Sequence, residues 1–261
     1  MVDYPISVKD AVLKLRTAPV DDLPALISRY ANDPRQGVRK AVEAADKRYR
    51  EYRAEYERTE ELYRFQWEIA GDGVVVGMDE VGRGAIAGPL TVACVQLPRE
   101  PIIVGLNDSK QLTPAMREDL ARQIRQHALA IGIAHVPPED IDALGMSRAL
   151  RRAMLEALED SGVEPDAVLI DGNDLHLHPK ERCIVKGDGR VAAIAAASII
   201  AKVTRDAIMS LAEADYPGYG FATSKGYASP EHIAAIQEKG MTEFHRVSFC
   251  GNIVNQQLGL F

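Results

Sequence analysis

The chain has 261 residues, of which 46% are hydrophobic and 26% charged, and this ordinary composition excludes a disordered, fibrous or membrane-spanning protein. A net charge of −7 argues against a protein held on nucleic acid by bulk positive charge, although it leaves room for local basic patches. The N-terminus has neither the basic start nor the apolar stretch of a signal peptide. We therefore expect a cytoplasmic, monomeric protein without a membrane partner.

Residues 1–70 are rich in charge but neutral, with 13 Lys and Arg against 13 Asp and Glu, so the rest of the chain carries the whole −7. After Gly37, helix-forming residues run to Ala70 with apolar side chains at steps of three, four or seven, which predicts one long amphipathic helix. Asp21 is the predicted cap of a shorter preceding helix. We expect a small all-helical module over residues 1–70.

The first half of the long predicted helix is locally basic. Between Arg35 and Arg53, seven basic residues stand against three acidic ones. Lys and Arg that face phosphates add salt-dependent affinity for a duplex. A solvated helix face with ordinary charge pairs has the same composition. The sequence leaves both interpretations open.

Beyond the GDG sequence at 71–73, short apolar runs alternate with helical segments, which predicts a mixed α/β domain over residues 71–250. Strands are expected over 74–80, 89–97, 128–136 and 166–172, and helices over 113–128, 145–162, 190–214 and 229–240. The helix over 190–214 is rich in Ala and Ile. It is apolar enough to lie in the core.

Four carboxylates stand where carboxylates are least expected. Asp79 and Glu80 end one predicted strand and Asp171 ends another, while Asp188 lies in the turn before the apolar helix. Each alone would also suit a helix cap or a turn. Together, at one end of a sheet, they make an oxygen-only site for Mg²⁺ or Mn²⁺. Two such ions about 3.5–4 Å apart suit phosphodiester cleavage, so a metal-dependent hydrolase is predicted.

Neither the cysteines nor the histidines predict a soft-metal site. The three cysteines lie far apart and form no CxxC pair, so we expect them to be reduced. His176 and His178 have no third partner, and we expect them to lie in a turn.

The sequence around the first two acids, GMDEVGRGAIAGP, resembles the signature of the bacterial ribonuclease HII family. The resemblance continues in order through LNDSKQLTP, VLIDGN, VKGDG, AAASIIAKVTRD, KGYASPEH and FHRVSF, and so covers residues 74–249. It implies a ribonuclease H-like fold, in which a mixed sheet with antiparallel first strands carries helices on both faces. It also implies that Asp79, Glu80, Asp171 and Asp188 bind two metal ions. Residues 1–70 resemble the N-terminal extension of some bacterial members.

The resemblance implies a substrate-binding set as well, which consists of Gly82, Arg83, Gly84, Asn107, Lys110, Lys202 and Tyr227. In the family the GRG loop reads the 2′-hydroxyl at an RNA-to-DNA junction, and glycines allow the backbone to approach a sugar closely. The matching tyrosine hydrogen-bonds there and stacks on the next deoxyribose, and the Asn and Lys residues contact phosphates. In isolation, GRG would also suit a plain turn. Many relatives carry a histidine where this chain has Ser224.

The implied activity is that of an endoribonuclease. It would cut on the 5′ side of ribonucleotides in RNA–DNA hybrids and of single ribonucleotides in duplex DNA, leaving 3′-hydroxyl and 5′-phosphate ends. Ribonuclease HIII-like activity, limited to long hybrids, is disfavoured by the intact GRG. A non-catalytic nucleic-acid or clamp-binding adaptor would have no reason to keep four mutually repelling acids. A carbohydrate hydrolase leaves LNDSK and GRG unexplained.

Residues 251–261 are expected to form a C-terminal tail. Its QLGLF ending resembles the peptide by which bacterial repair proteins bind the sliding clamp, and the matching residues are Gln257, Leu258, Leu260 and Phe261. Apolar side chains on an exposed tail gain most from a pocket on a partner. The alternative is that Leu260 and Phe261 fold back on their own domain.

Overall fold

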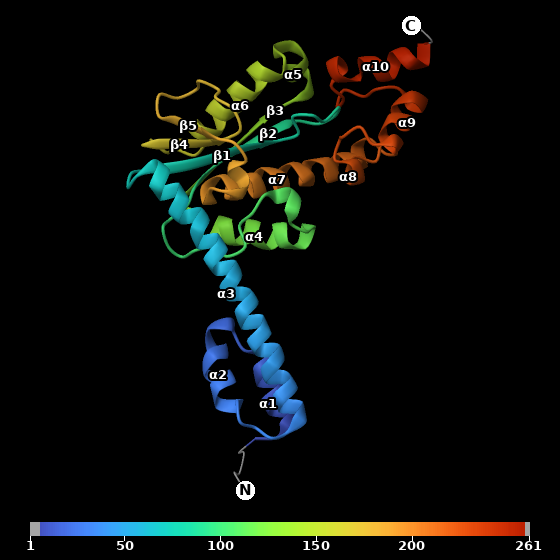
Figure 1. The fold of residues 1–261 in the computed structure, drawn as a ribbon. Coiled ribbons are helices and arrows are strands. Elements are labelled where there is room, and N and C mark those ends of the chain that lie inside the picture. Colours follow the sequence, from blue (N-terminus) through green and yellow to red (C-terminus); the bar gives the residue numbers. More distant parts are fainter. Residues whose placement is uncertain (1–5, 259–261) are drawn as a thin grey trace. The chain divides into compact units, whose positions relative to one another are not determined.

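The computed structural model describes residues 6–258, apart from the side chains of residues 254–258 (Figure 1). The chain divides into two compact units, residues 1–60 and residues 61–261. Each unit has a buried apolar core of its own. No helix in the described part of the chain is long and apolar enough to cross a membrane.

The first unit is helical, as expected. It contains α1 (Val8–Thr17), α2 (Leu23–Tyr30) and the first part of the long α3 (Gln36–Ala70). Ser7 caps α1 by accepting a 3.1 Å hydrogen bond from the Asp10 backbone N–H. The core of this unit consists of Ala11, Leu15, Leu23, Tyr30, Val38 and Ala45.

The predicted cap of the shorter helix is wrong. Asp21 lies in a 3-10 turn over Val20–Asp22, and α2 begins only at Leu23. Asp22 occupies the cap position but makes no side-chain cap hydrogen bond, and its backbone is already helical at φ −84° and ψ −15°. The turn and Pro24, whose ring presets a helical φ, therefore start this helix without a capping carboxylate.

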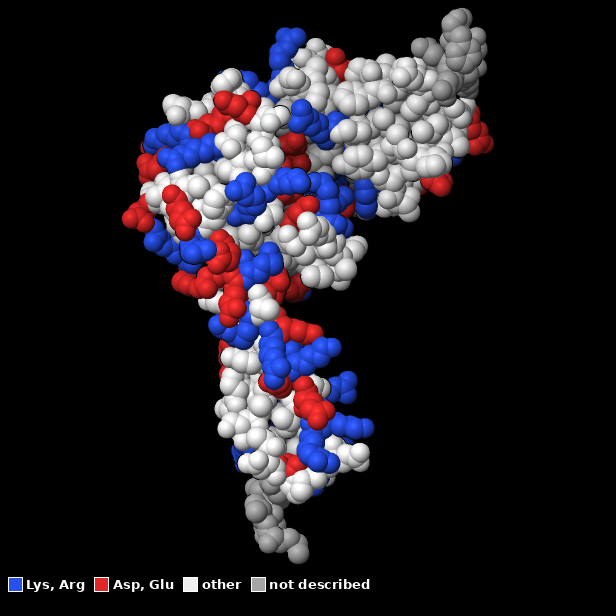
Figure 2. Space-filling view, in the orientation of Figure 1, with Lys and Arg blue, Asp and Glu red and all other residues white. Residues whose placement is uncertain are grey.

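The locally basic stretch of α3 is largely engaged in its own unit. Arg50 lies 2.5 Å from Asp46, and Lys47 and Arg53 pair with acids one turn away. Arg48 donates to carbonyls at the C-terminal end of α1, at 2.6 Å from Arg16 O and 2.9 Å from Ala18 O. Red and blue side chains alternate along this helix in Figure 2. Ordinary charge pairs account for these contacts, but exposed ion pairs are weak, so a role of the stretch in binding a duplex stays a prediction.

The second unit is built on the expected mixed sheet. Its strands are β1 (Val75–Val81), β2 (Leu90–Gln96), β3 (Ala130–Val136), β4 (Ala167–Asp171) and β5 (Glu181–Ile184). They run in the order β3-β2-β1-β4-β5, with β1, β2 and β3 antiparallel and β4 and β5 parallel to β1. Sequence inspection missed β5, because this short, half-exposed edge strand has no long apolar run.

The helices of this unit are α4 (Pro114–His127), α5 (Pro138–Leu144), α6 (Met146–Asp160), α7 (Ala192–Asp215), α8 (Phe221–Ser224), α9 (Pro230–Lys239) and α10 (Val247–Leu258). In Figure 1, α6 lies over one face of the sheet, and α7 and α4 lie over the other. Neither α5 nor α10 was expected. Because α10 is continuous from Val247 to Leu258, the predicted division at residue 250 falls inside a helix.

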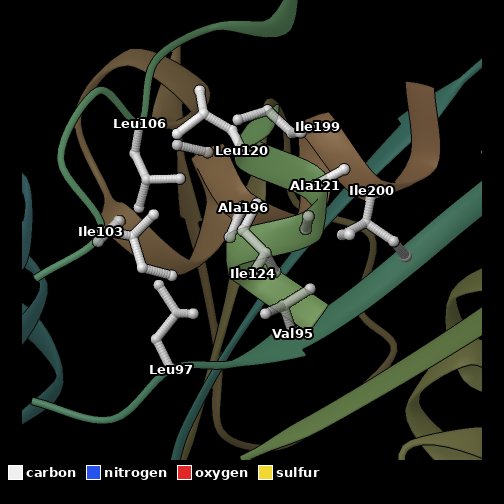
Figure 3. Close-up of a cluster of buried hydrophobic side chains, with 14 of the residues drawn as sticks. Val95, Leu97, Ile103, Leu106, Leu120, Ala121, Ile124, Ala196, Ile199 and Ile200 are labelled. Carbon is white, nitrogen blue, oxygen red and sulfur yellow. The ribbon is translucent and has the colours of Figure 1, made fainter. Parts of the chain in front are cut away.

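The core between the sheet and the α4–α7 layer contains Val95 from β2, Leu120 and Ile124 from α4, and Ile199 and Ile200 from α7, and these side chains converge in Figure 3. Residues 191–201 are all buried, which confirms the expected core position of the Ala- and Ile-rich helix. A Cβ placed on Gly77 would lie 2.2 Å from the Ala193 carbonyl carbon. Only glycine lets the first turn of α7 lie directly on β1.

The last turns of α3 belong to this second unit and not to the helical module. Leu62 and Tyr63 are buried in the α4–α7 core, and the Tyr63 hydroxyl accepts a 3.3 Å hydrogen bond from the Ile103 N–H. Gln66 Oε1 accepts a 2.8 Å bond from the N–H of Ala193, in the first turn of α7. The compact units therefore divide about ten residues before the predicted boundary at residue 71.

Candidate active site

Strand pairing brings the predicted acids to one edge of the sheet. β1 and β4 are parallel and their last paired residues are Met78 and Ile170, so Asp79 and Asp171 follow side by side. Asp171 in turn pairs with Ile184 at the end of β5. Four residues later, Asp188 lies in a short 3-10 turn that leads into α7. Residues far apart in the chain thus meet beyond the carboxyl ends of neighbouring strands.

The carboxylates of this edge lie close enough to interact through their charges. Burial, the Glu80 charge and the Asp171 charge together hold the pKa of Asp79 well above its usual range, and Asp79 is only 6% exposed. Burial also raises the pKa of Glu80. For Asp188, burial and the charges of Asp171 and Asp108 raise the pKa. Burying several ionised carboxylates next to one another costs free energy, because they lose water and repel each other. A cation bound among them offsets that cost.

Two basic side chains stand at the rim of the cluster. Lys110 Nζ lies 3.9 Å from Asp188 Oδ2, and Arg83 Nη1 lies 3.6 Å from Glu80 Oε1. Both side chains are mostly exposed, at 79% for Lys110 and 63% for Arg83. Exposed ion pairs are weak, so either cation is free to turn toward a bound phosphate.

A cavity of about 330 Å³ opens beside the acids. It is lined by Asp79, Glu80, Val81, Ser109, Lys110, Ser198, Lys202 and Tyr227. Five of these residues are predicted site residues, and they come from four separate segments of the chain. Lys202 is already paired with Asp206 at 2.7 Å and is 17% exposed, so it is less available than Lys110. Asn107 faces its own loop, where its side chain accepts from the Asp108 N–H and donates to Gln111.

Ser109 and Ser198, which sequence inspection did not single out, complete the floor of the cavity. Their hydroxyls lie 3.0 Å apart, and the Ser198 hydroxyl also hydrogen-bonds Asp79, which lowers the pKa of that acid against the effect of burial. Ser198 belongs to α7 and Ser109 to the loop before α4. The pair therefore ties the loop that carries Lys110 to the buried acid.

Arg246, which is fully buried, hydrogen-bonds the backbone of the GRG loop. Its guanidinium donates to four loop carbonyls, at 2.7 Å to Gly82 O, 3.3 Å to Arg83 O, 2.8 Å to Ala85 O and 2.8 Å to Gly88 O. Gly82 has φ +90°, a conformation that favours glycine. The residue that shapes this loop lies about 160 residues away in the sequence. No local pattern could have indicated the contact.

Arg205 joins the GRG loop to the Tyr227 segment. It donates to Ala87 O at 2.9 Å and to Lys225 O at 2.7 Å, and its guanidinium carbon lies 5.6 Å from the centre of the Tyr227 ring. Asp206, the next residue in the chain, pairs with Lys202 instead. Among the described residues, neither Arg205 nor Arg246 has an ion-pair partner. Both buried cations instead organise backbone carbonyls.

A second group of possible ligands is formed by Asp174, in the loop before β5, and by Glu181 and Cys183, on β5 itself. Burial raises the pKa of Glu181, but backbone N–H groups, those of Leu175 and Leu177 first, lower it to about 2. These donors already occupy both carboxylate oxygens. His178 Nδ1 accepts from the Lys180 N–H in the same turn. The group therefore supports a loop and is separate from the cavity.

Comparison with known proteins agrees with this arrangement. Residues 76–252 match the family model described as "Ribonuclease HII", and residues 7–70 match "Ribonuclease HII N-terminal domain". A ribonuclease HII from Enterococcus faecalis is 38% identical over 246 residues, which cover 93% of this chain and 94% of that protein.

Two archaeal structures are similar to this chain over about two thirds of its length. Ribonuclease H2 from Pyrococcus horikoshii has a TM-score of 0.62 at 26% identity, covering 70% of this chain and 98% of that one. Ribonuclease HII from Archaeoglobus fulgidus, solved in complex with PCNA, has a TM-score of 0.59 at 26% identity over 67% of this chain and 94% of that one.

The expected ribonuclease H-like fold is thereby confirmed, together with the acids' place at the end of its central strands. The family model covers most of the chain, and the match to a curated relative runs through both units. The chain therefore belongs to the ribonuclease HII family and is an endoribonuclease, a hydrolase that acts on nucleic acid.

Proposed function

We propose that the chain is a Mg²⁺- or Mn²⁺-dependent endoribonuclease that cuts on the 5′ side of ribonucleotides in RNA–DNA hybrids and of single ribonucleotides in duplex DNA. The products would be 3′-hydroxyl and 5′-phosphate ends. The observation that carries the proposal is the convergence of Asp79 and Glu80 with Lys110 and Tyr227 around one cavity, with Asp171 and Asp188 close enough to act on the same charges. We expect this enzyme to work in the cytoplasm, where its DNA substrate lies.

The donor set fits hard divalent ions. Asp79, Glu80, Asp171 and Asp188 offer only oxygen ligands, which Mg²⁺ and Mn²⁺ prefer, and the raised pKa of buried Asp79 means that its charge needs a cation nearby. Two bound ions would supply activation of a water and stabilisation of the departing oxygen. The side chains of this chain would hold the ions and orient the scissile phosphate. Lys110, at the rim, would add a phosphate contact.

Discrimination for ribose would come from the GRG loop and Tyr227. Gly84 is exposed and a Cβ placed on it would meet no atom within 4 Å, so its backbone is open to a sugar. Tyr227 is 38% exposed at the mouth of the cavity, where its hydroxyl can reach a ligand. A 2′-hydroxyl both donates and accepts hydrogen bonds, and it is the group that separates RNA from DNA.

Incubation with a duplex that contains one ribonucleotide tests the proposal directly. We expect a single cut on the 5′ side with Mg²⁺ or Mn²⁺ and none with EDTA. Cleavage of a long RNA–DNA hybrid without cleavage at the single ribonucleotide would instead assign a ribonuclease HIII-like specificity. Binding without cleavage under every metal condition would leave only the adaptor function.

Tyr227→Phe is expected to lower kcat at a single embedded ribonucleotide by about 3- to 10-fold, which corresponds to the loss of one hydrogen bond. Affinity for the duplex should change little, because phosphate contacts dominate it. Single-turnover kinetics and binding titrations on the same duplex measure both quantities. Tyr216→Phe is the matched control, since its hydroxyl binds Glu243 outside the cavity. Equal losses of rate and affinity in Tyr227→Phe would contradict the positioning role.

We also propose that the C-terminal residues bind the bacterial sliding clamp. Gln257 and Leu258 are the last residues of α10, whereas Leu260 and Phe261 lie outside the described residues. The similarity to an archaeal relative that was solved with PCNA supports this choice of partner. From Val247 to the end of the chain there is no charged side chain, which suits insertion into an apolar pocket.

Purified clamp should bind the wild-type chain with micromolar affinity, because a short peptide has few anchors and loses entropy on docking. Removal of residues 257–261 should abolish binding and leave cleavage of the ribonucleotide duplex unchanged. A variant with Leu260 and Phe261 replaced by Ala is the conservative control and should also lose binding. Clamp binding that is equal in wild-type and truncated chains would end this proposal.

A further inference from the structure

Two histidines are buried in contact with each other beneath the Tyr227 segment. His232, on α9, is fully buried and His245 is 2% exposed, and their Nε2 atoms lie 3.1 Å apart. The aromatic rings of Tyr219 and Phe221 pack against them, with ring centres 5.1 and 5.2 Å away. A polar pair in such apolar surroundings is costly unless every nitrogen is hydrogen-bonded.

The hydrogen bonds determine which nitrogen carries each proton. His232 Nδ1 lies 2.9 Å from the Tyr227 carbonyl, which can only accept, so Nδ1 is protonated. His245 Nδ1 accepts a 3.0 Å bond from the Thr242 N–H and therefore has no proton of its own. Neutral His245 must then carry its proton on Nε2 and donate it to His232 Nε2. The chain of bonds runs in one direction, from Thr242 through both rings to Tyr227.

The electrostatics keep both rings neutral. Burial lowers the pKa of His245 to about 4, with a further contribution from His232. Burial also lowers the pKa of His232, although its bond to the Tyr227 carbonyl acts in the opposite direction. Each ring therefore holds one proton at neutral pH, which is the number that the bond pattern requires.

The direction in which the Tyr227 side chain points depends on how the two peptide groups beside it are held. Its ring is 38% exposed, and the guanidinium carbon of Arg205 lies 5.6 Å from its centre. The peptide before it is fixed because Gly226 O accepts from the N–H groups of Ile86 and Ala87, in the segment that follows the GRG loop. The carbonyl after it accepts from His232 and from the Ser229 N–H. His232 is the side chain that fixes this second peptide.

We propose that His232, oriented by His245, is a positioning residue that sets the direction of Tyr227 toward the ribose of the substrate. This inference rests on the proposed role of Tyr227 in recognising that ribose. His232 touches neither substrate nor metal ligands, so it would act only through the Tyr227 peptide. Loss of its bond should lower the rate of the bound complex more than the affinity for the duplex.

Two substitutions separate the two bonds of His232. The amide nitrogen of Asn occupies roughly the place of Nδ1 and keeps a donor toward Tyr227 O, whereas the amide of Gln reaches roughly the place of Nε2 and keeps only the contact with His245. We expect His232→Gln to lower kcat at a single embedded ribonucleotide by about 3- to 10-fold, the equivalent of one hydrogen bond, with KM little changed. His232→Asn should stay close to wild type in kcat. Both should lower Tm, because each loses one buried bond.

If kcat fell in proportion to Tm in both variants, whichever nitrogen is kept, the inference would be overturned. A lower kcat for His232→Asn than for His232→Gln would overturn it as well. His245→Gln, which keeps a donor beside His232 Nε2, provides a second variant that should retain kcat. All variants are compared well below their Tm, after circular dichroism has established that they are folded.

A double-mutant cycle with Tyr227→Ala distinguishes this inference from the proposed function. If His232 acts through Tyr227, His232→Gln should have no further effect on kcat in the Tyr227→Ala background. Additive effects would refute the positioning role of His232 while leaving Tyr227 in place as a recognition residue. No effect of Tyr227→Ala alone would refute the role proposed for Tyr227 and the inference with it.

Discussion

Asp79→Asn is expected to lower the rate of cleavage at a single embedded ribonucleotide by more than about a hundredfold, or about 2.7 kcal/mol of transition-state stabilisation. Asp79 is buried at the end of β1, and the charges of Glu80 and Asp171 act on it directly. Replacing it with an amide would remove one of the proposed metal-binding oxygens and the charge that the ions would neutralise. Steady-state cleavage of a labelled duplex in Mg²⁺ and in Mn²⁺ measures the loss.

The same substitution should leave the protein folded and, without metal, at least as stable as the wild type. Burial raises the pKa of Asp79, so its charged form is disfavoured in the folded protein and a neutral amide relieves the repulsion. Urea unfolding in EDTA checks this expectation. A nuclease-dead variant that had also lost stability would point to misfolding and not to loss of a metal ligand.

Asp108→Asn is the matched control. Asp108 is close enough to Asp188 to raise its pKa, yet its own carboxylate accepts a 2.9 Å bond from the Lys110 N–H at the start of a 3-10 turn. Asn serves equally well in that capping position, so only a small change in rate is expected. Near wild-type turnover of Asp79→Asn, or an equal loss in Asp108→Asn, would contradict the assignment of the metal ligands.

Removal of residues 1–70 is expected to lower the free energy of unfolding of the remaining domain by about 4–7 kcal/mol relative to removal of residues 1–60. The ten residues between these ends contribute buried Leu62 and Tyr63, each worth about 1.5–3 kcal/mol. They also contribute the Gln66 bond to the first turn of α7, worth about 1 kcal/mol. Urea unfolding of the two truncated chains measures the difference.

Point variants of the full-length chain test the same contacts without changing where the chain begins. Leu62→Ala and Gln66→Ala should each reduce stability without a change in chain length, and Leu62→Ala should have the larger effect, about 2–5 kcal/mol. The chain lacking residues 1–60 should retain cleavage of the single-ribonucleotide duplex. If the two truncated chains were equally stable, residues 61–70 would belong with the N-terminal module instead.

The sequence by itself determined the fold class and the candidate catalytic acids. Strands β1 and β4 are apolar runs that end in acids, and a charge at the end of a core strand is unusual enough to be noticed in a single chain. The long α7 was equally clear, since a run of Ala and Ile without Gly or Pro indicates a helix buried in the core. These features are local, so the information that predicts them lies within a few residues.

Tertiary structure alone decided how the recognition segments are supported. Arg246 shapes the GRG loop, Gln66 caps α7, and His232 joins His245 to the Tyr227 carbonyl. In the sequence, each of these side chains looks like an ordinary polar residue on a helix or in a loop. Their bonds go mainly to backbone carbonyls and amides, which carry no sequence signal. The physical reason is that burial, and with it the value of each hydrogen bond, is set only when distant segments pack together.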